Sequence, residues 1–363
     1  MNHTPLDIVF LGLSITSSWG NGHATTYRGL VHALHKRGHR VLFLERDVEW
    51  YAAHRDLPDP PYGRTVLYRS LDELRGHFTQ AVKHADLVVV GSYVPDGIEV
   101  GDWVQRTATG VTAFYDIDTP VTLRQLESGG APYLAAEQIS RYDLYLSFTG
   151  GPTLARIERD YGAPLAWPLY CSADPAGYFE EPTRHRWDLG YMGTYSEDRQ
   201  PALHALLIEP ASLWPDGRFV VAGPMYPEEI AWPANVQRIP HLAPPNHRVF
   251  YNSQRFTLNV TRRDMALAGF SPSVRLFEAA ACAAPVITDE WEGIDHFFVP
   301  GEEILIARSI QDTLRYLREL PEEERRTIGR RARDRVLAEH TPAHRAAELE
   351  AYARRARAGH VMH

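Results

Sequence analysis

The feature that most constrains the fold is a repeated order of apolar strand, glycine-rich turn and amphipathic helix. Residues 7–13 form a short apolar run, a loop with Gly20 and Gly22 follows, and a helical pattern then ends at Gly38. A second apolar run covers residues 40–45. Strands that alternate with helices form parallel sheets covered by helices. The sequence therefore predicts an α/β fold.

The same pattern starts again at residues 189–192, which precede a turn at Gly193 and a helical run of leucines. A chain of 363 residues is long enough for two domains. Each half shows several strands followed by polar or glycine-bearing loops, and such loops form the binding crevice of open α/β sheets. We expect two Rossmann-like, doubly wound domains that face each other across a cleft.

Composition excludes several other classes of protein. The apolar fraction of 44% suits a globular chain, and the net charge of −8 disfavours nucleic acid or an anionic membrane as partner. The two cysteines, Cys171 and Cys282, stand in apolar contexts and are expected to be reduced. The start of the chain lacks signal-peptide features and no apolar run reaches membrane-spanning length, so we expect a cytoplasmic protein without a transmembrane segment.

The stretch from Gly269 to Gly301 carries the most informative pattern. Ser271 can cap a helix, and Pro272 suits its first position. Arg275 and Glu278 lie three apart, so both point the same way. They could form an internal ion pair. Alternatively they belong to a ligand site, in which Arg275 and the helix N-terminus bind a diphosphate and Glu278 accepts hydrogen bonds from a ribose.

Four motifs carry a family resemblance: FYDIDTPVTL, YMGTYSEDR, FVVAGPMYP and SPSVRLFEAAACAAP. The chain resembles GT-B glycosyltransferases, and most closely the spore-maturation CgeB-like family. It departs from that family at Ala283, where glycine is usual, and it has no acidic residue at Gly269-Phe270, where retaining relatives often have one. The resemblance implies an acceptor-side domain over residues 1–172, a nucleotide-sugar domain over residues 173–340, and a terminal helix over residues 341–363 that packs back on the first domain.

The predicted donor site lies at the strand ends of the second half. Gly193, Gly223, Thr261 and Ser271 each follow or flank a strand end there, and such ends converge in a Rossmann unit. Arg199 follows the Gly193 turn, although an ordinary turn with a solvated arginine is the alternative. The predicted donor residues are Gly193, Thr194, Tyr195, Arg199, Gly223, Thr261, Arg262, Ser271, Ser273, Arg275 and Glu278.

The predicted catalytic residues lie in the first half. His23 follows the glycine loop, at the place where the resemblance puts the general base of inverting GT-B enzymes; a helix-start role is the alternative. Asp118 is the candidate to orient the His23 ring, or else caps a helix that begins at Thr119-Pro120. A metal role for Asp116 and Asp118 is a weaker alternative. Acceptor-side residues are expected to be Gly20, Asn21, Gly22 and Thr119.

These residues and the resemblance predict a glycosyltransferase that moves a sugar from a nucleotide diphosphate donor, expected to be UDP-linked, to an unknown glycan, protein or small-molecule acceptor. Arginine and the helix dipole can take the charge of the leaving diphosphate, so no metal or other cofactor is required. Two alternatives stay open. One is an NAD(P)-dependent oxidoreductase that uses the Gly20 loop with Glu45 or Asp47 on the ribose. The other is a non-catalytic nucleotide- or sugar-binding protein with the same fold.

Overall fold

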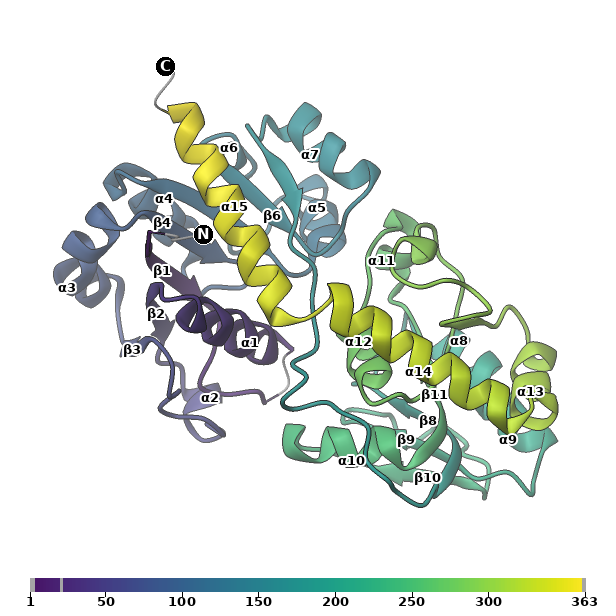
Figure 1. Cartoon of the computed structure of the whole chain (residues 1–363). Coiled ribbons are helices and arrows are strands. Elements are labelled where there is room, and N and C mark those ends of the chain that lie inside the picture. The colour runs from purple at the N-terminus through teal and green to yellow at the C-terminus, as the bar shows by residue number, and fades with distance from the viewer. Residues whose placement is uncertain (1–3, 20–21, 361–363) are drawn as a thin grey trace. The chain divides into compact units, whose positions relative to one another are not determined.

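The computed structural model describes residues 4–19 and 22–360, and it forms two compact units. Unit 1 holds residues 1–170 together with 342–363, and unit 2 holds residues 171–341. The predicted α/β class with two Rossmann-like domains is confirmed, because each unit is built on its own parallel sheet (Figure 1).

Unit 1 has a seven-stranded sheet in the order β3-β2-β1-β4-β5-β6-β7. Its strands are β1 (Asp7–Gly12), β2 (Arg40–Arg46), β3 (Arg64–Tyr68), β4 (Leu87–Gly91), β5 (Val111–Asp116), β6 (Leu144–Ser147) and β7 (Ala166–Pro168). Its helices are α1 (His23–Lys36), α2 (Glu49–Ala52), α3 (Leu71–His84), α4 (Gly97–Thr107), α5 (Thr119–Glu127), α6 (Ala136–Ile139), α7 (Pro152–Tyr161) and α15 (Pro342–His360). The strand order reverses between β1 and β4, which is where such sheets open a binding crevice.

Unit 2 has a six-stranded sheet in the order β10-β9-β8-β11-β12-β13. Its strands are β8 (Trp187–Met192), β9 (Phe219–Ala222), β10 (Val236–Ile239), β11 (Gln254–Asn259), β12 (Val286–Thr288) and β13 (Leu305–Ile306). Its helical segments are α8 (Gln200–Leu203), η1 (His204–Ile208), α9 (Glu209–Leu213), η2 (Pro244–Asn246), α10 (His247–Asn252), α11 (Arg263–Ala268), α12 (Val274–Ala281), η3 (Ile294–His296), α13 (Ile310–Glu319) and α14 (Glu322–Glu339). Here the order reverses between β8 and β11.

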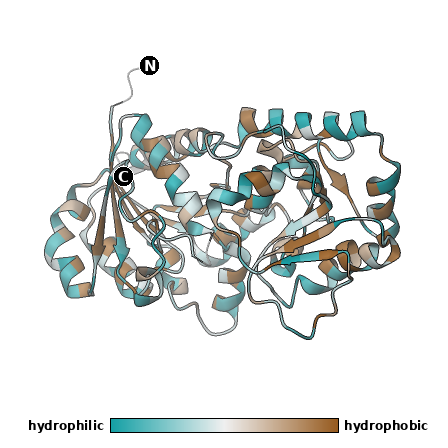
Figure 2. Ribbon diagram, turned by 90° about the horizontal axis from the view of Figure 1, so that it is seen from below, coloured by the Kyte–Doolittle hydropathy of each residue, from teal (hydrophilic) through white to brown (hydrophobic). Residues whose placement is uncertain are grey.

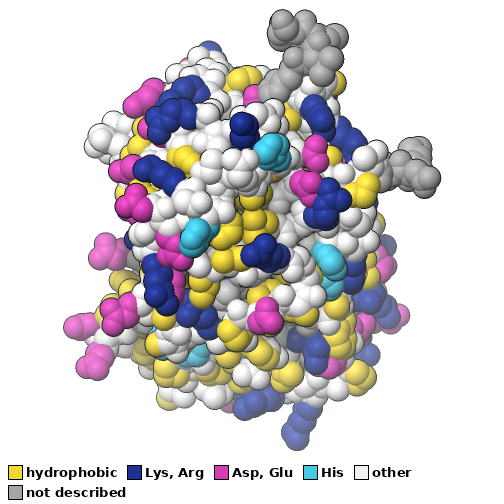
Figure 3. All heavy atoms as spheres, turned by 90° about the vertical axis from the view of Figure 1, so that its left-hand side faces the viewer, with side chains coloured by type: hydrophobic (Ala, Val, Ile, Leu, Met, Phe, Trp, Pro, Cys, Tyr) yellow, Lys and Arg dark blue, Asp and Glu magenta, His cyan; other side chains and the backbone are white. Residues whose placement is uncertain are grey.

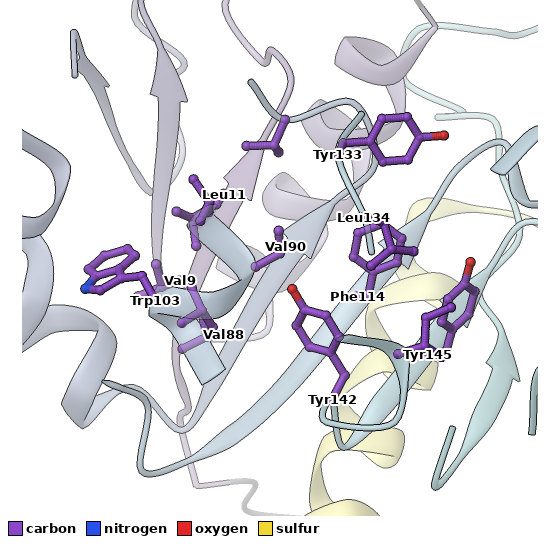
Figure 4. Close-up of a cluster of buried hydrophobic side chains, with 14 of the residues drawn as sticks. Val9, Leu11, Val88, Val90, Trp103, Phe114, Tyr133, Leu134, Tyr142 and Tyr145 are labelled. Carbon is purple, nitrogen blue, oxygen red and sulfur yellow. The ribbon is translucent and has the colours of Figure 1, made fainter. Parts of the chain in front are cut away.

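Alternate residues of the unit 1 strands build the core on one face of its sheet. Val9 and Leu11 of β1 lie beside Val88 and Val90 of β4, and all four are at most 3% exposed (Figure 4). The strands are strongly hydrophobic, whereas the helices are hydrophobic on one side and hydrophilic on the other (Figure 2). This pattern is expected when helices cover a parallel sheet.

The last helix, α15, belongs to unit 1 and lies along α1 (Figure 1). Glu350 of α15 is 3% exposed and accepts hydrogen bonds from Arg37, with His39 Nε2 at 3.3 Å. Tyr352 donates its hydroxyl to the Pro168 carbonyl oxygen at 3.1 Å. Polar contacts on both sides thus fix α15 to the sheet and to α1.

No helix or strand was predicted within residues 50–69, yet this segment contains most of α2 and the edge strand β3, which pairs with β2. The predicted start of one helix was wrong. The helix of the key stretch begins at Val274 and not at Pro272; its N-cap is Ser273, whose hydroxyl makes no capping bond. Ser273 instead donates to Asn259 Oδ1 at 2.7 Å, so a tertiary contact replaces the expected local cap.

Charged side chains are mixed over the surface in Figure 3, where Lys and Arg alternate with Asp and Glu. Both cysteines are buried, and they are not joined in a disulfide. Within the described residues, none of the helices combines the length and the apolar character that crossing a bilayer requires.

Candidate functional site

Two glycine turns of unit 2 meet at the carboxyl ends of β8 and β9. Gly193 donates its N–H to the Ala222 carbonyl oxygen at 2.9 Å, and Gly223 has a positive φ of 144°. A Cβ on Gly223 would collide with the Gly193 carbonyl, and one on Gly193 would lie 2.9 Å from Arg275 Nη2. Glycine is therefore required at both positions, because the two turns approach each other and the Arg275 guanidinium closely.

Arg275 is held rigidly beside these turns. Its Nε donates to the Met192 carbonyl oxygen at 2.5 Å, its Nη1 donates to Asn259 Oδ1 at 2.7 Å, and its guanidinium lies 4.7 Å from the Tyr191 ring centre. The residue is only 8% exposed. Since a guanidinium has five N–H donors, donors remain for a ligand.

Arg199 and Arg262 bring two more positive charges to this place. Burial lowers the pKa of Arg199, and the charges of Arg275 and Arg262 lower it further. Arg199 donates Nη2 to the Thr194 carbonyl oxygen at 2.7 Å, while its buried Nε has no hydrogen-bond partner among the described residues. Arg262 Nε lies 4.0 Å from Asp198. Three guanidinium groups so close together form a site suited to an anion.

Asn259 and Asp289, which the sequence reasoning missed, organise the end of β11. Asn259 accepts from both Ser273 and Arg275, and it donates to Thr288 Oγ1 at 2.9 Å. Asp289 accepts from the Thr261 N–H and hydroxyl at 3.1 and 2.9 Å. Burial raises the pKa of Asp289. The only sequence signal for either was a polar residue at a strand end.

Glu278 and Arg275 do not form the internal ion pair that was one alternative, because in the described chain each binds other partners. Glu278 is 4% exposed and accepts from the Tyr251 hydroxyl at 2.9 Å. This phenol donor holds the carboxylate on the buried side of α12.

The remaining predicted donor residues lie around these groups. Tyr195 donates its N–H to the Pro224 carbonyl oxygen at 3.0 Å, which ties its turn to the one after β9. Ser271 lies just before α12 and is 1% exposed, so its side chain has little surface to offer a ligand.

In unit 1, His23 is the first residue of α1 and is 7% exposed. Burial lowers its pKa to about 4, although the negative charge of Asp118 acts in the opposite direction. Its buried Nδ1 has no hydrogen-bond partner within residues 4–19 and 22–360. The ring is therefore neutral at pH 7, which is the form that can accept a proton.

Tyr93 connects His23 with Asp118. Its ring meets the His23 ring edge-on, with centres 5.3 Å apart, and its hydroxyl donates to Asp118 Oδ2 at 3.1 Å. Tyr93 has φ of 63°, an uncommon value for a residue with a side chain. His23, Tyr93 and Asp118 come from the ends of β1, β4 and β5. Three strand ends thus meet where the strand order reverses.

The side chains of Asp116 and Thr119 are buried in unit 1 and form hydrogen bonds there. Asp116 is fully buried and accepts from Tyr145, Thr122 and the Asp118 N–H, and burial raises its pKa to about 6. Thr119 is also fully buried, and its hydroxyl contacts Ser147 Oγ at 2.7 Å. This placement does not support the prediction that Thr119 contacts an acceptor.

Of the remaining acceptor-side predictions, Gly22 is the exposed N-cap of α1, whereas Gly20 and Asn21 lie outside the described residues. Asp118 stands at the N-cap position of α5 but makes no capping bond with its side chain.

Glu45 is not available for a nicotinamide ribose. It is fully buried, and its carboxylate accepts from the Ser14 hydroxyl and from the N–H groups of Ile15 and Thr16. Asp47 is paired with Arg55. The oxidoreductase alternative is therefore not favoured.

Comparison with known proteins agrees with this geometry. A family model described as glycosyl transferase-like matches residues 199–351, which hold all three arginines of the cluster and Glu278. No curated protein matches the chain in sequence.

Solved structures match nearly the whole chain. The sucrose-phosphate synthase of Thermosynechococcus elongatus has a TM-score of 0.69 at 15% identity, covering 96% of this chain and 98% of its own. HepE of Anabaena, solved with UDP and glucose, gives 0.66 at 12% identity, with 95% and 98% covered. An alpha-glucosyltransferase solved with UDP and DNA gives 0.71 at 11% identity, with 96% and 100% covered.

These likenesses show that the chain has the GT-B fold of two Rossmann-like domains. Fold and family match together support a glycosyltransferase. The narrower resemblance to the CgeB-like family stays a prediction.

Proposed function

We propose that the protein transfers a sugar from a UDP-linked donor, bound by unit 2, to a hydroxyl group of an acceptor bound by unit 1. The observation that carries this proposal is the group of three arginines beside the Gly193 and Gly223 turns. A diphosphate would accept hydrogen bonds from their guanidinium groups, and the N-terminus of α12 adds further N–H donors.

The same groups account for leaving-group departure. As the bond between the sugar and the diphosphate breaks, negative charge grows on the diphosphate oxygen. Preorganised guanidinium groups stabilise that charge without having to reorganise. Arg275 is preorganised in this sense, since Met192, Asn259 and Tyr191 fix its position.

In unit 1, neutral His23 is the group proposed to take the acceptor proton as the hydroxyl attacks the anomeric carbon. Asp118 would stabilise the imidazolium that forms, because its charge already favours the protonated ring. Tyr93 positions Asp118 through its hydroxyl. A general base at this position is what a single direct displacement needs, and such a displacement inverts the anomeric centre.

A thermal-shift panel of UDP, GDP, ADP and NAD tests the donor assignment. We expect UDP to raise the melting temperature, because a ligand that binds only the folded state stabilises it by about 2.7 kcal/mol at one hundred times its dissociation constant. A shift with NAD alone would contradict the proposal. A shift with GDP or ADP but not UDP would keep the transferase and change the donor.

We expect Glu278→Gln to weaken UDP binding by about 1–3 kcal/mol, the range for a hydrogen bond to a charged group, if the carboxylate accepts from the ribose. The amide can still accept from Tyr251, so the free energy of unfolding should change little. Calorimetry and melting of the same variant separate the two effects. A lower stability with unchanged UDP affinity would make Glu278 a structural residue of α12.

A further inference from the structure

A cavity lies in unit 2, away from the arginine cluster. Its volume is about 600 Å³, and it is lined by residues 180–183 and His185, by Tyr251, Asn252 and Gln254, by residues 282–284, and by three arginines of α14. Thr261 and Arg262 follow the other end of β11, and six strand residues separate the two ends by roughly 17–20 Å. Tyr251 also donates to Glu278. The cavity is therefore separate from the arginine cluster, although it adjoins the contact between Tyr251 and Glu278.

The α14 wall of this cavity carries an excess of positive charge. Arg325 and Arg326 share one carboxylate, Glu322, at 2.7 and 3.0 Å. Arg330 also lines the cavity; it donates to Thr327 Oγ1 and forms no ion pair within the described chain. One carboxylate does not neutralise these three arginines, so this part of the cavity attracts anions although the chain as a whole is negative.

The lining also contains two carboxylates. Glu181 is paired with Arg248 at 3.1 Å, whereas Glu180 is exposed. The Gln254 amide is used internally, since it donates to Phe250 and accepts from Thr257. An occupant therefore meets both arginines and a carboxylate. Phosphate oxygens accept from arginine, and sugar hydroxyls donate to a carboxylate.

The volume of the cavity favours a phosphorylated sugar over inorganic phosphate as the ligand. Pockets of about 300–1,000 Å³ hold whole small molecules, and an inorganic phosphate would fill only a small part of 600 Å³. We propose that this cavity is a second ligand site, for a phosphorylated sugar, with the phosphate on Arg326 and Arg330 and hydroxyls on Glu180. This proposal does not depend on the proposed function.

The test is calorimetric titration of the full chain with glucose 6-phosphate, with glucose and with inorganic phosphate, both without UDP and with saturating UDP. The double variant Arg326→Gln/Arg330→Gln is compared with Arg331→Gln, a neighbouring arginine that pairs with Glu302 and does not line the cavity. Each charged hydrogen bond contributes about tenfold in affinity, so the double variant should bind glucose 6-phosphate about 10²-fold more weakly. The control should bind normally.

Several results of these titrations would each overturn a part of the proposal. No binding of glucose 6-phosphate, or equal binding by wild type and double variant, would overturn the site. Inorganic phosphate binding as tightly as the sugar phosphate would overturn the sugar part, and glucose binding as tightly would overturn the role of the arginines. If UDP fails to bind, the donor assignment fails, while the titration without UDP still decides the cavity.

Discussion

We expect His23→Ala to lower turnover by about 10²-fold or more while leaving UDP affinity unchanged. Proton transfer by a positioned base typically contributes 10²–10⁴-fold. The lower end is expected here because burial lowers the pKa of His23 to about 4, which makes it a weaker base than an exposed histidine. UDP binding should survive, since the proposed donor groups all belong to unit 2.

The pH dependence of kcat/KM gives a second readout for the same residue. His23 is active when neutral, so the rate should stay level as the pH falls through 6.5 and should drop only near pH 4. In His23→Ala this acid limb should disappear from the residual activity. An acid limb near pH 6.5 would show that acceptor binding or another group controls the titration.

A matched control is His35→Ala, in which an exposed histidine of the same helix is removed. It should turn over normally. Product analysis by NMR reports the anomeric configuration once a substrate pair is found. Retention of configuration, or near-normal turnover of His23→Ala, would remove His23 from the mechanism and leave it as a helix-start residue.

The sequence could predict which residues follow the ends of strands and therefore lie at the edge of a sheet where ligands bind. Glycine turns and polar residues after apolar runs mark the carboxyl edge of a parallel sheet, and Gly193, Gly223 and Arg275 do lie together there. Asn259 and Asp289 could not be found in this way. Their role depends on the register of β11 against β12, which sets Asn259 opposite Thr288, and register follows from tertiary packing.

The sequence also does not show how deeply a side chain is buried. The structure buries His23, and this burial lowers its pKa. The edge strand β3 was missed for a related reason. Most of its residues are only partly buried, so its sequence RTVLY lacks the continuous apolar run of the central strands.

The second large effect is expected for Arg199→Gln, which should weaken UDP binding about 10- to 100-fold without destabilising the protein. Arg199 has no carboxylate partner among the described residues. Burial and the charges of Arg275 and Arg262 lower its pKa, and its guanidinium donates to the Thr194 carbonyl oxygen. A bound diphosphate would relieve this repulsion, and losing one charged hydrogen bond to it costs about 1.5–3 kcal/mol.

Without ligand, the same substitution removes a partly buried charge from beside two like charges. The free energy of unfolding should therefore stay unchanged or rise slightly, a trade of stability for function that binding sites often show. Melting without UDP and calorimetry with UDP are measured on Arg199→Gln and on the control Arg331→Gln, whose side chain pairs with Glu302. A lower melting temperature with wild-type UDP affinity would contradict this prediction. Arg199 would then stabilise the turn at Thr194, and other groups would have to bind the diphosphate.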